Sequence, residues 1–136
     1  MQGLKTEERE IDGLLVTTTQ LPPVRALVLS KRLLPIVAPI IAAGQLEQVD
    51  GAALGEALES LEDSAVVQLL LRTLAGTVVR VDGEQRALAN EDAINGVFAG
   101  RFTTMLRVAW FAIEVNFFPG GVGELLASAP KSKASR

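Results

Sequence analysis

The fold of this chain is decided by residues 97–118, which read VFAGRFTTMLRVAWFAIEVNFF. The stretch holds every aromatic residue of the protein, because the sequence has one tryptophan, five phenylalanines and no tyrosine. These residues are Phe98, Phe102, Trp110, Phe111, Phe117 and Phe118. Aromatic side chains bring the largest apolar area per residue. The place where this stretch packs is therefore expected to be the energetic centre of the fold.

At 100° per residue, the stretch reads as a helix that is apolar on nearly every side. One apolar stripe contains Phe98, Phe102, Met105, Ala109 and Ile113, a second contains Val108, Phe111, Val115 and Phe118, and the polar strip between them contains Thr103, Arg107 and Glu114. A helix of this kind lies in the middle of a large core or is shared with another chain. Because 136 residues offer only a modest core, the pattern favours a shared surface.

Asn116 is the polar exception on the first stripe. A buried amide without hydrogen-bond partners costs about 1–3 kcal/mol. We therefore expect its side chain to bond a neighbouring backbone end or a partner chain, unless it lies in a frayed last turn and meets water.

Composition excludes several classes of function. The net charge is −3, which argues against nucleic acid as a partner, since phosphate binding needs a basic face. Cysteine and histidine are absent, so no disulfide, thiolate zinc site or histidine base is available. No acidic or glycine-rich segment has the spacing of a calcium loop or a phosphate-binding loop. We expect no catalytic residue, no metal and no cofactor, and hence no enzyme.

The chain reads as one domain with two loose ends. Residues 1–12 are charged and lack the apolar centre of a secretory signal, so they are expected to be a flexible lead-in. Residues 129–136 read as a disordered basic tail, which leaves a single helical domain at 13–128. The longest apolar run, residues 33–43, is too short for the roughly 20 residues that span a membrane. We expect a cytosolic protein with no membrane partner.

Within that domain the sequence predicts a mainly α (α+β) fold. Residues 14–19 form a strand, and residues 77–88 form a β-hairpin around the turn Asp82-Gly83. The sheet is therefore a small hairpin, or has three strands if the first one joins. A helix begins at Pro23 and is expected to kink or divide at Pro35 and Pro39. Further helices follow Asp50, Asp63 and Asn90 as candidate caps, and Gly100 separates or bends the last one.

The order of these features resembles the tail assembly chaperones of long-tailed bacteriophages. The resemblance rests on LPPVRAL at residues 21–27 after a strand, LLP at 33–35, FAGR at 98–101 and FAIEVNF at 111–117, and it covers residues 11–118. Its most distinctive part is FAGR together with the EVNF ending.

The resemblance implies a non-catalytic assembly factor in the host bacterial cytoplasm, absent from the mature virion. Such a protein binds the phage tape measure protein, a long apolar helical chain, and helps to recruit tail tube subunits. Apolar helix faces suit this client because helices dock into grooves, and homo-oligomers would cover the faces until it arrives. The alternative is a structural tail or head-completion subunit. The predicted partner-binding residues are Phe98, Phe102, Trp110, Phe111, Asn116, Phe117 and Phe118.

Overall fold

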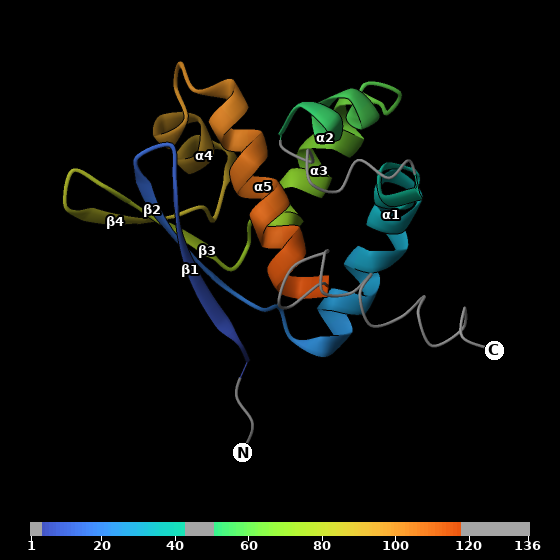
Figure 1. The fold of residues 1–136 in the computed structure, drawn as a ribbon, viewed down its shortest axis with the longest axis horizontal. Helices are drawn as coiled ribbons and strands as arrows, with labels where there is room; N and C mark the ends of the chain where they lie inside the picture. The colour runs from blue at the N-terminus through green and yellow to red at the C-terminus, as the bar shows by residue number, and fades with distance from the viewer. Residues whose placement is uncertain (1–3, 43–50, 118–136) are drawn as a thin grey trace.

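The computed structural model describes residues 4–42 and 51–117 and contains four strands and five helices in these ranges. In chain order they are β1 (Thr6–Ile11), β2 (Leu14–Thr19), α1 (Pro23–Ala42), α2 (Gly51–Leu58), α3 (Asp63–Thr73), β3 (Thr77–Val81), β4 (Glu84–Ala87), α4 (Glu91–Val97) and α5 (Phe102–Phe117). In Figure 1 the sheet lies on one side of α5, and α1, α2 and α3 lie on the other. The last helix is thus the middle layer of the molecule.

The sheet is an antiparallel meander in the order β1-β2-β3-β4, with α1, α2 and α3 inserted between β2 and β3. Side chains along β2 alternate strictly, so that Leu14, Val16 and Thr18 are buried. Val16 lies opposite Val79, and the hydroxyl groups of Thr18 and Thr77 form a buried 2.8 Å hydrogen bond. The predicted strand at 14–19 does join the hairpin, but the expected limit of three strands is wrong, because the sheet has four.

The additional strand is β1, and it comes from the residues expected to be a flexible lead-in. Thr6–Ile11 pairs with β2 along its whole length, so that expectation is wrong for these residues. The turn between them has φ of 51° at Asp12 and 86° at Gly13, almost the values of 52° and 82° at Asp82 and Gly83. Two consecutive positive φ angles define the tight hairpin turn that Asp-Gly favours. Both hairpins therefore use the same turn chemistry.

Helix α1 is continuous through Pro35 and Pro39, so the expected division into two short helices is not observed. Each proline removes one backbone N–H, which leaves the carbonyl groups of Lys31 and Pro35 without their usual helical donor. Lys31 and Pro35 lie on the exposed side of the helix, where water can donate a hydrogen bond to each carbonyl group. The cost of the two prolines is therefore small enough for the helix to continue.

Residues 97–118 do not form one helix. Asn90 caps α4 as predicted, its Oδ1 accepting from the Ala93 N–H at 2.8 Å, and α4 ends at Val97. Gly100, with φ of 75°, then turns the chain into α5. Asp63 is not the cap of α3, because Glu62 precedes it at that position without a side-chain hydrogen bond. Asp50 and the predicted tail lie outside the described residues.

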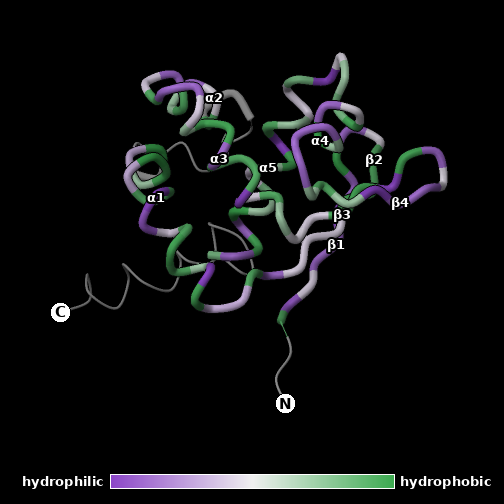
Figure 2. Tube along the Cα trace, turned by 180° about the vertical axis from the view of Figure 1, so that it is seen from behind, coloured by the Kyte–Doolittle hydropathy of each residue, from purple (hydrophilic) through white to green (hydrophobic). Residues whose placement is uncertain are grey.

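The core is centred on α5. Nine of its 16 residues are buried, and it contacts β1 and β2 on one side and α2 and α3 on the other. Figure 2 shows the same middle position from behind, with α5 between the strands and helices α1, α2 and α3. A helix that is apolar in most directions is thus covered by its own chain. The inference that α5 needs a second chain to cover it does not follow from this fold.

Candidate partner-binding surface

Most of the predicted aromatic binding residues lie inside the core. Phe98, Trp110 and Phe111 have exposed fractions of 5%, 4% and 1%. Phe117 is partly buried against the same core, and Phe118 lies outside the described residues. Phe102 is the exception, with 68% of its surface exposed. In this conformation a partner can reach Phe102 directly, but not the three buried rings.

The polar strip of α5 holds the first hairpin in place. The Arg9 guanidinium of β1 lies 4.5 Å from the centre of the Phe111 ring, and its Nη1 is 3.1 Å from Glu114 Oε1. Asp12 in the turn accepts hydrogen bonds from Thr104 Oγ1 at 2.7 Å and from Arg107 Nη1 at 2.9 Å. These contacts give the charged strand β1 a structural role on α5.

Asn116 is also used within the chain. Its Oδ1 accepts from the Leu21 backbone N–H at 2.8 Å, and its Nδ2 donates to the Ala112 carbonyl at 2.9 Å. The neighbouring Gln20 side chain donates to the Val115 carbonyl at 3.0 Å. The amide was expected to bond either a neighbouring backbone end or a partner chain. The structure shows the first, with backbone groups of the same chain as both partners. The pair of contacts ties the end of α5 to the segment from which α1 begins.

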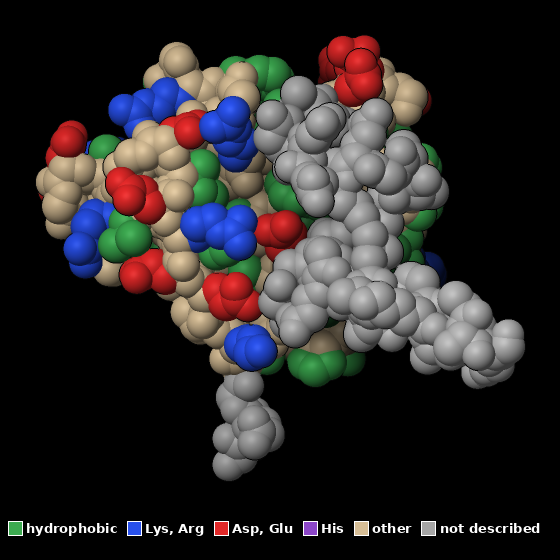
Figure 3. Space-filling view, viewed as in Figure 1, with side chains coloured by type: hydrophobic (Ala, Val, Ile, Leu, Met, Phe, Trp, Pro, Cys, Tyr) green, Lys and Arg blue, Asp and Glu red, His purple; other side chains and the backbone are tan. Residues whose placement is uncertain are grey.

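Of the six large hydrophobic residues that the described part of the chain exposes, four lie on α1. We use the name outer stripe for these four side chains, Val24, Leu27, Val28 and Leu34, which are 73%, 64%, 43% and 52% exposed. They lie opposite the buried stripe of the same helix, which contains Leu29, Leu33, Ile36, Val37 and Ile40. By contrast, acidic and basic side chains are interspersed over the sheet side of the molecule in Figure 3. Helix α1 is therefore apolar on two opposite sides, and only one is covered.

The sequence carried a signal for the outer stripe. Leu27 and Val28 follow Val24 by three and four residues, and Leu34 follows Leu27 by seven, which places all four on one helix face apart from the buried stripe. The outer stripe was not among the predicted binding residues, because that prediction was based on the aromatic residues of the sequence.

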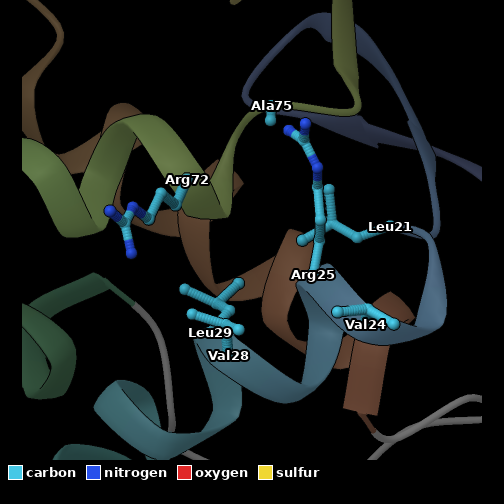
Figure 4. A pocket seen from close by; sticks show the side chains of 7 residues that line it. All are labelled: Leu21, Val24, Arg25, Val28, Leu29, Arg72 and Ala75. Atoms are coloured by element: carbon cyan, nitrogen blue, oxygen red, sulfur yellow. The ribbon is translucent and has the colours of Figure 1, made fainter.

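Beside the outer stripe, α1 and α3 enclose a shallow groove made of two neighbouring hollows, which we call the α1–α3 groove. The first hollow is lined by Leu21, Val24, Arg25, Val28, Leu29, Arg72 and Ala75 (Figure 4). The second is lined by Lys31, Arg32, Pro35, Ile36, Leu61, Ser64, Ala65, Gln68, Leu69 and Arg72. Arg72 belongs to both, so the hollows follow each other along the two helices. The groove shares Val24 and Val28 with the outer stripe, which makes one continuous apolar surface.

The lining of the groove is basic although the protein is acidic overall. Arg25, Lys31, Arg32 and Arg72 line it, and no carboxylate from residues 4–42 or 51–117 does. In Figure 4 the side chain of Arg25 extends from α1 toward Ala75, while Arg72 extends from α3. The ion pairs found in the described part of the chain involve other cations, namely Arg9, Arg86 and Arg107. The groove therefore combines aliphatic side chains with four positive charges that no described carboxylate pairs.

A smaller apolar surface surrounds Phe102 at the start of α5. A hollow beside it is lined by Ile94, Asn95, Phe98, Ala99, Gly100, Phe102 and Met105, and we call this region the Phe102 patch. It contains most of the FAGR segment and lies where the chain turns from α4 into α5.

The described residues present no candidate metal centre. They contain no group of three or more acidic, histidine or cysteine side chains placed to hold a metal ion. None of the helices in the described ranges is both long and apolar enough to cross a bilayer. The surface features that remain are the outer stripe, the α1–α3 groove and the Phe102 patch, all of which suit the binding of another polypeptide.

Comparison with known proteins agrees with the resemblance drawn from the sequence. A family model described as "Phage tail assembly chaperone protein, TAC" matches residues 12–119. This match covers well over half of the chain and includes every described element except β1. No curated protein and no solved structure matches the chain.

Proposed function

The chain belongs to the phage tail assembly chaperone family, and from this premise we propose that it binds the tape measure protein of its phage and helps to recruit tail tube subunits. We propose further that it acts without catalysis in the cytoplasm of the host bacterium and is absent from the finished particle. The absence of histidine and cysteine from the sequence supports a non-catalytic role.

The observation that carries the proposal is the outer stripe of α1. The buried stripe on the opposite side already anchors this helix to the core. The described part of the fold therefore gives no reason for Val24, Leu27, Val28 and Leu34 to be apolar. Covering an aliphatic side chain contributes about 1.5–3 kcal/mol when burial is complete. Four of them, on one side of one helix, would contribute a substantial part of the free energy of a complex, against the cost of association.

The shape of this surface favours a helical client. The outer stripe runs along α1, and the α1–α3 groove runs beside it between two helices. A helix that lays an apolar face into such a groove is a common mode of peptide recognition. The family resemblance implies a client of this kind, since the tape measure protein is long, helical and apolar.

Self-association follows from the same surface. Without its client, the protein would expose the outer stripe and the Phe102 patch to water, which favours contacts between copies. We therefore propose homo-oligomers that exchange this contact for the client, with the Phe102 patch available to a second copy or to a tail tube subunit.

Co-expression tests the proposal. The tape measure protein of the same phage should remain soluble and co-purify when expressed with this chain, and should precipitate when expressed alone. A tape measure protein that is equally insoluble with and without the chain would contradict the proposed function.

Mass spectrometry of purified phage particles separates this function from the alternative. A chaperone should be missing or far below one copy per tail ring, whereas a structural tail or head-completion subunit should be present in stoichiometric amounts. Stoichiometric recovery from the particle would therefore favour the structural role.

A further inference from the structure

The α1–α3 groove has a charge that no carboxylate of the described residues balances, and this charge selects among possible clients. Arg25, Lys31 and Arg32 come from α1 and Arg72 from α3, and they flank the aliphatic side chains of Leu29, Ile36 and Leu69. No ion pair in the described part of the chain involves any of the four cations. A helix bound in the groove would bring its flanking side chains close to these charges.

We propose that the α1–α3 groove is the client site and that it selects amphipathic helices whose apolar stripe is flanked by Asp or Glu. This inference rests on the proposed function, and it adds the position of the site and the chemistry of the segment it recognises. Carboxylates beside the apolar stripe would pair with the four cations, while the stripe itself covers Val24 and Val28. Segments flanked by Lys or Arg would meet like charges and be rejected.

A second copy of the chain fits the groove less well. Apart from the outer stripe, the large exposed apolar residues of the described ranges are Leu4 and Phe102. Leu4 precedes Lys5, and Phe102 follows Arg101, so neither offers an acidic apolar helix face. A symmetric contact of α1 with α1 would bring the same basic residues together. Both arrangements lack the charge complementarity that an acidic helix supplies.

The C-terminal sequence is also a poor match in charge. Residues 118–136 contain Lys131, Lys133 and Arg136 and one acidic residue, Glu124, so the segment is basic. Its three cations, all within residues 131–136, would meet like charges in the groove, so we take a client helix as the occupant.

Three synthetic helical peptides test the proposal directly. They share one stripe of leucine and alanine and differ only in the flanking residues, which are all Glu, all Gln or all Lys. Fluorescence anisotropy with the full-length chain should rank their affinities Glu, then Gln, then Lys, with about tenfold between the extremes at low salt. Equal affinity for the Glu and Lys peptides would overturn the proposal.

Charge reversal locates the effect. Arg25→Glu combined with Arg72→Glu brings the summed charge of the four cationic positions to zero and should abolish the ranking of the three peptides. Arg80→Glu is the matched control, since Arg80 is an exposed cation on β3 in the sheet, and it should leave the order unchanged. If the double variant loses its helical circular dichroism, Lys31→Glu with Arg32→Glu makes the same test with two exposed residues. An order that survives charge reversal in a folded variant would overturn the proposal.

Co-expression of the same variants with the tape measure protein separates this inference from the proposed function. If the unaltered chain fails to retain the tape measure protein, the proposed function is wrong. If the unaltered chain and the charge-reversed variant retain it equally, the function stands and the groove is not the client site. Light scattering completes the test, because a variant that changes oligomer size but not peptide affinity would assign the groove to a second copy.

Discussion

Helices α5 and α1 are both apolar in more than one direction, yet only one of them is enclosed. Helix α5 lies between the sheet and α2 and α3, and nine of its residues are buried. Helix α1 buries one stripe, and on the opposite side it exposes Val24, Leu27, Val28 and Leu34. The apolar surface of α5 is explained by its neighbours within the chain. The outer stripe of α1 has no such explanation, so it is the better evidence for a partner.

Of the substitutions that test the difference between α5 and α1, Trp110→Ala should have the largest effect on stability. Replacing this residue, which is 4% exposed on α5, by alanine should lower the free energy of unfolding by about 3–5 kcal/mol, because it leaves a cavity in the core. Urea denaturation followed by far-ultraviolet circular dichroism measures the change.

Leu27→Ala on α1 is the matched control, since it also shortens an apolar helical side chain. It should cost less than about 0.5 kcal/mol because Leu27 is 64% exposed. Similar losses for the two variants would contradict the assignment of α5 to the core and of the outer stripe to the surface.

An intermediate effect is expected where the two helices are tied together. Asn116→Ala removes the acceptor of the Leu21 N–H and should destabilise the fold by about 1–2 kcal/mol, because that donor is partly buried. Hydrogen exchange measured by NMR should show faster exchange of the Leu21 amide. Asn95→Ala is a suitable control, as Asn95 is an exposed residue of α4. An unchanged Leu21 exchange rate would mean that water replaces the amide at no cost.

The smallest effect on stability should accompany the largest loss of binding. Val24→Ser combined with Leu27→Ser should change the free energy of unfolding by less than about 0.5 kcal/mol, since both residues are largely exposed. The same variant should retain much less tape measure protein in co-expression. Phe102→Ser removes an equally exposed apolar side chain from the Phe102 patch and should keep the client. Full retention by the α1 variant would remove the outer stripe from the proposed site.

Part of the fold could be predicted because its signals are local. The Asp82-Gly83 turn, the cap at Asn90 and the break at Gly100 each depend on a few adjacent residues, and the structure confirms them. The Asp12-Gly13 turn carries the same signal but was missed, because Glu7, Glu8, Arg9 and Glu10 before it look like solvated charge. Such residues suit an edge strand, where charge discourages pairing with other chains.

The binding surface was harder to predict because burial depends on which elements become neighbours. The aromatic pattern of α5 is compatible with a core or with an interface, and only its position between two layers decides that Trp110 and Phe111 are enclosed. The groove was even harder to predict from the sequence. Arg25 and Arg72 are 47 residues apart and line the same hollow only when α1 packs beside α3. The outer stripe, by contrast, could be read from the spacing of α1 alone.

The insertion of three helices into the meander has a consequence for how the chain folds. The turns at Asp12-Gly13 and Asp82-Gly83 let each hairpin form from residues close in sequence, whereas Thr18 must find Thr77 across 59 positions. Strands that are close in sequence pair quickly, whereas strands that are far apart in sequence pair more slowly, because joining them costs more conformational entropy. We therefore expect the two halves of the sheet to join late, once the inserted helices have shortened the distance between them. In this order of events, β2 pairs with β3 only after α1, α2 and α3 have packed together.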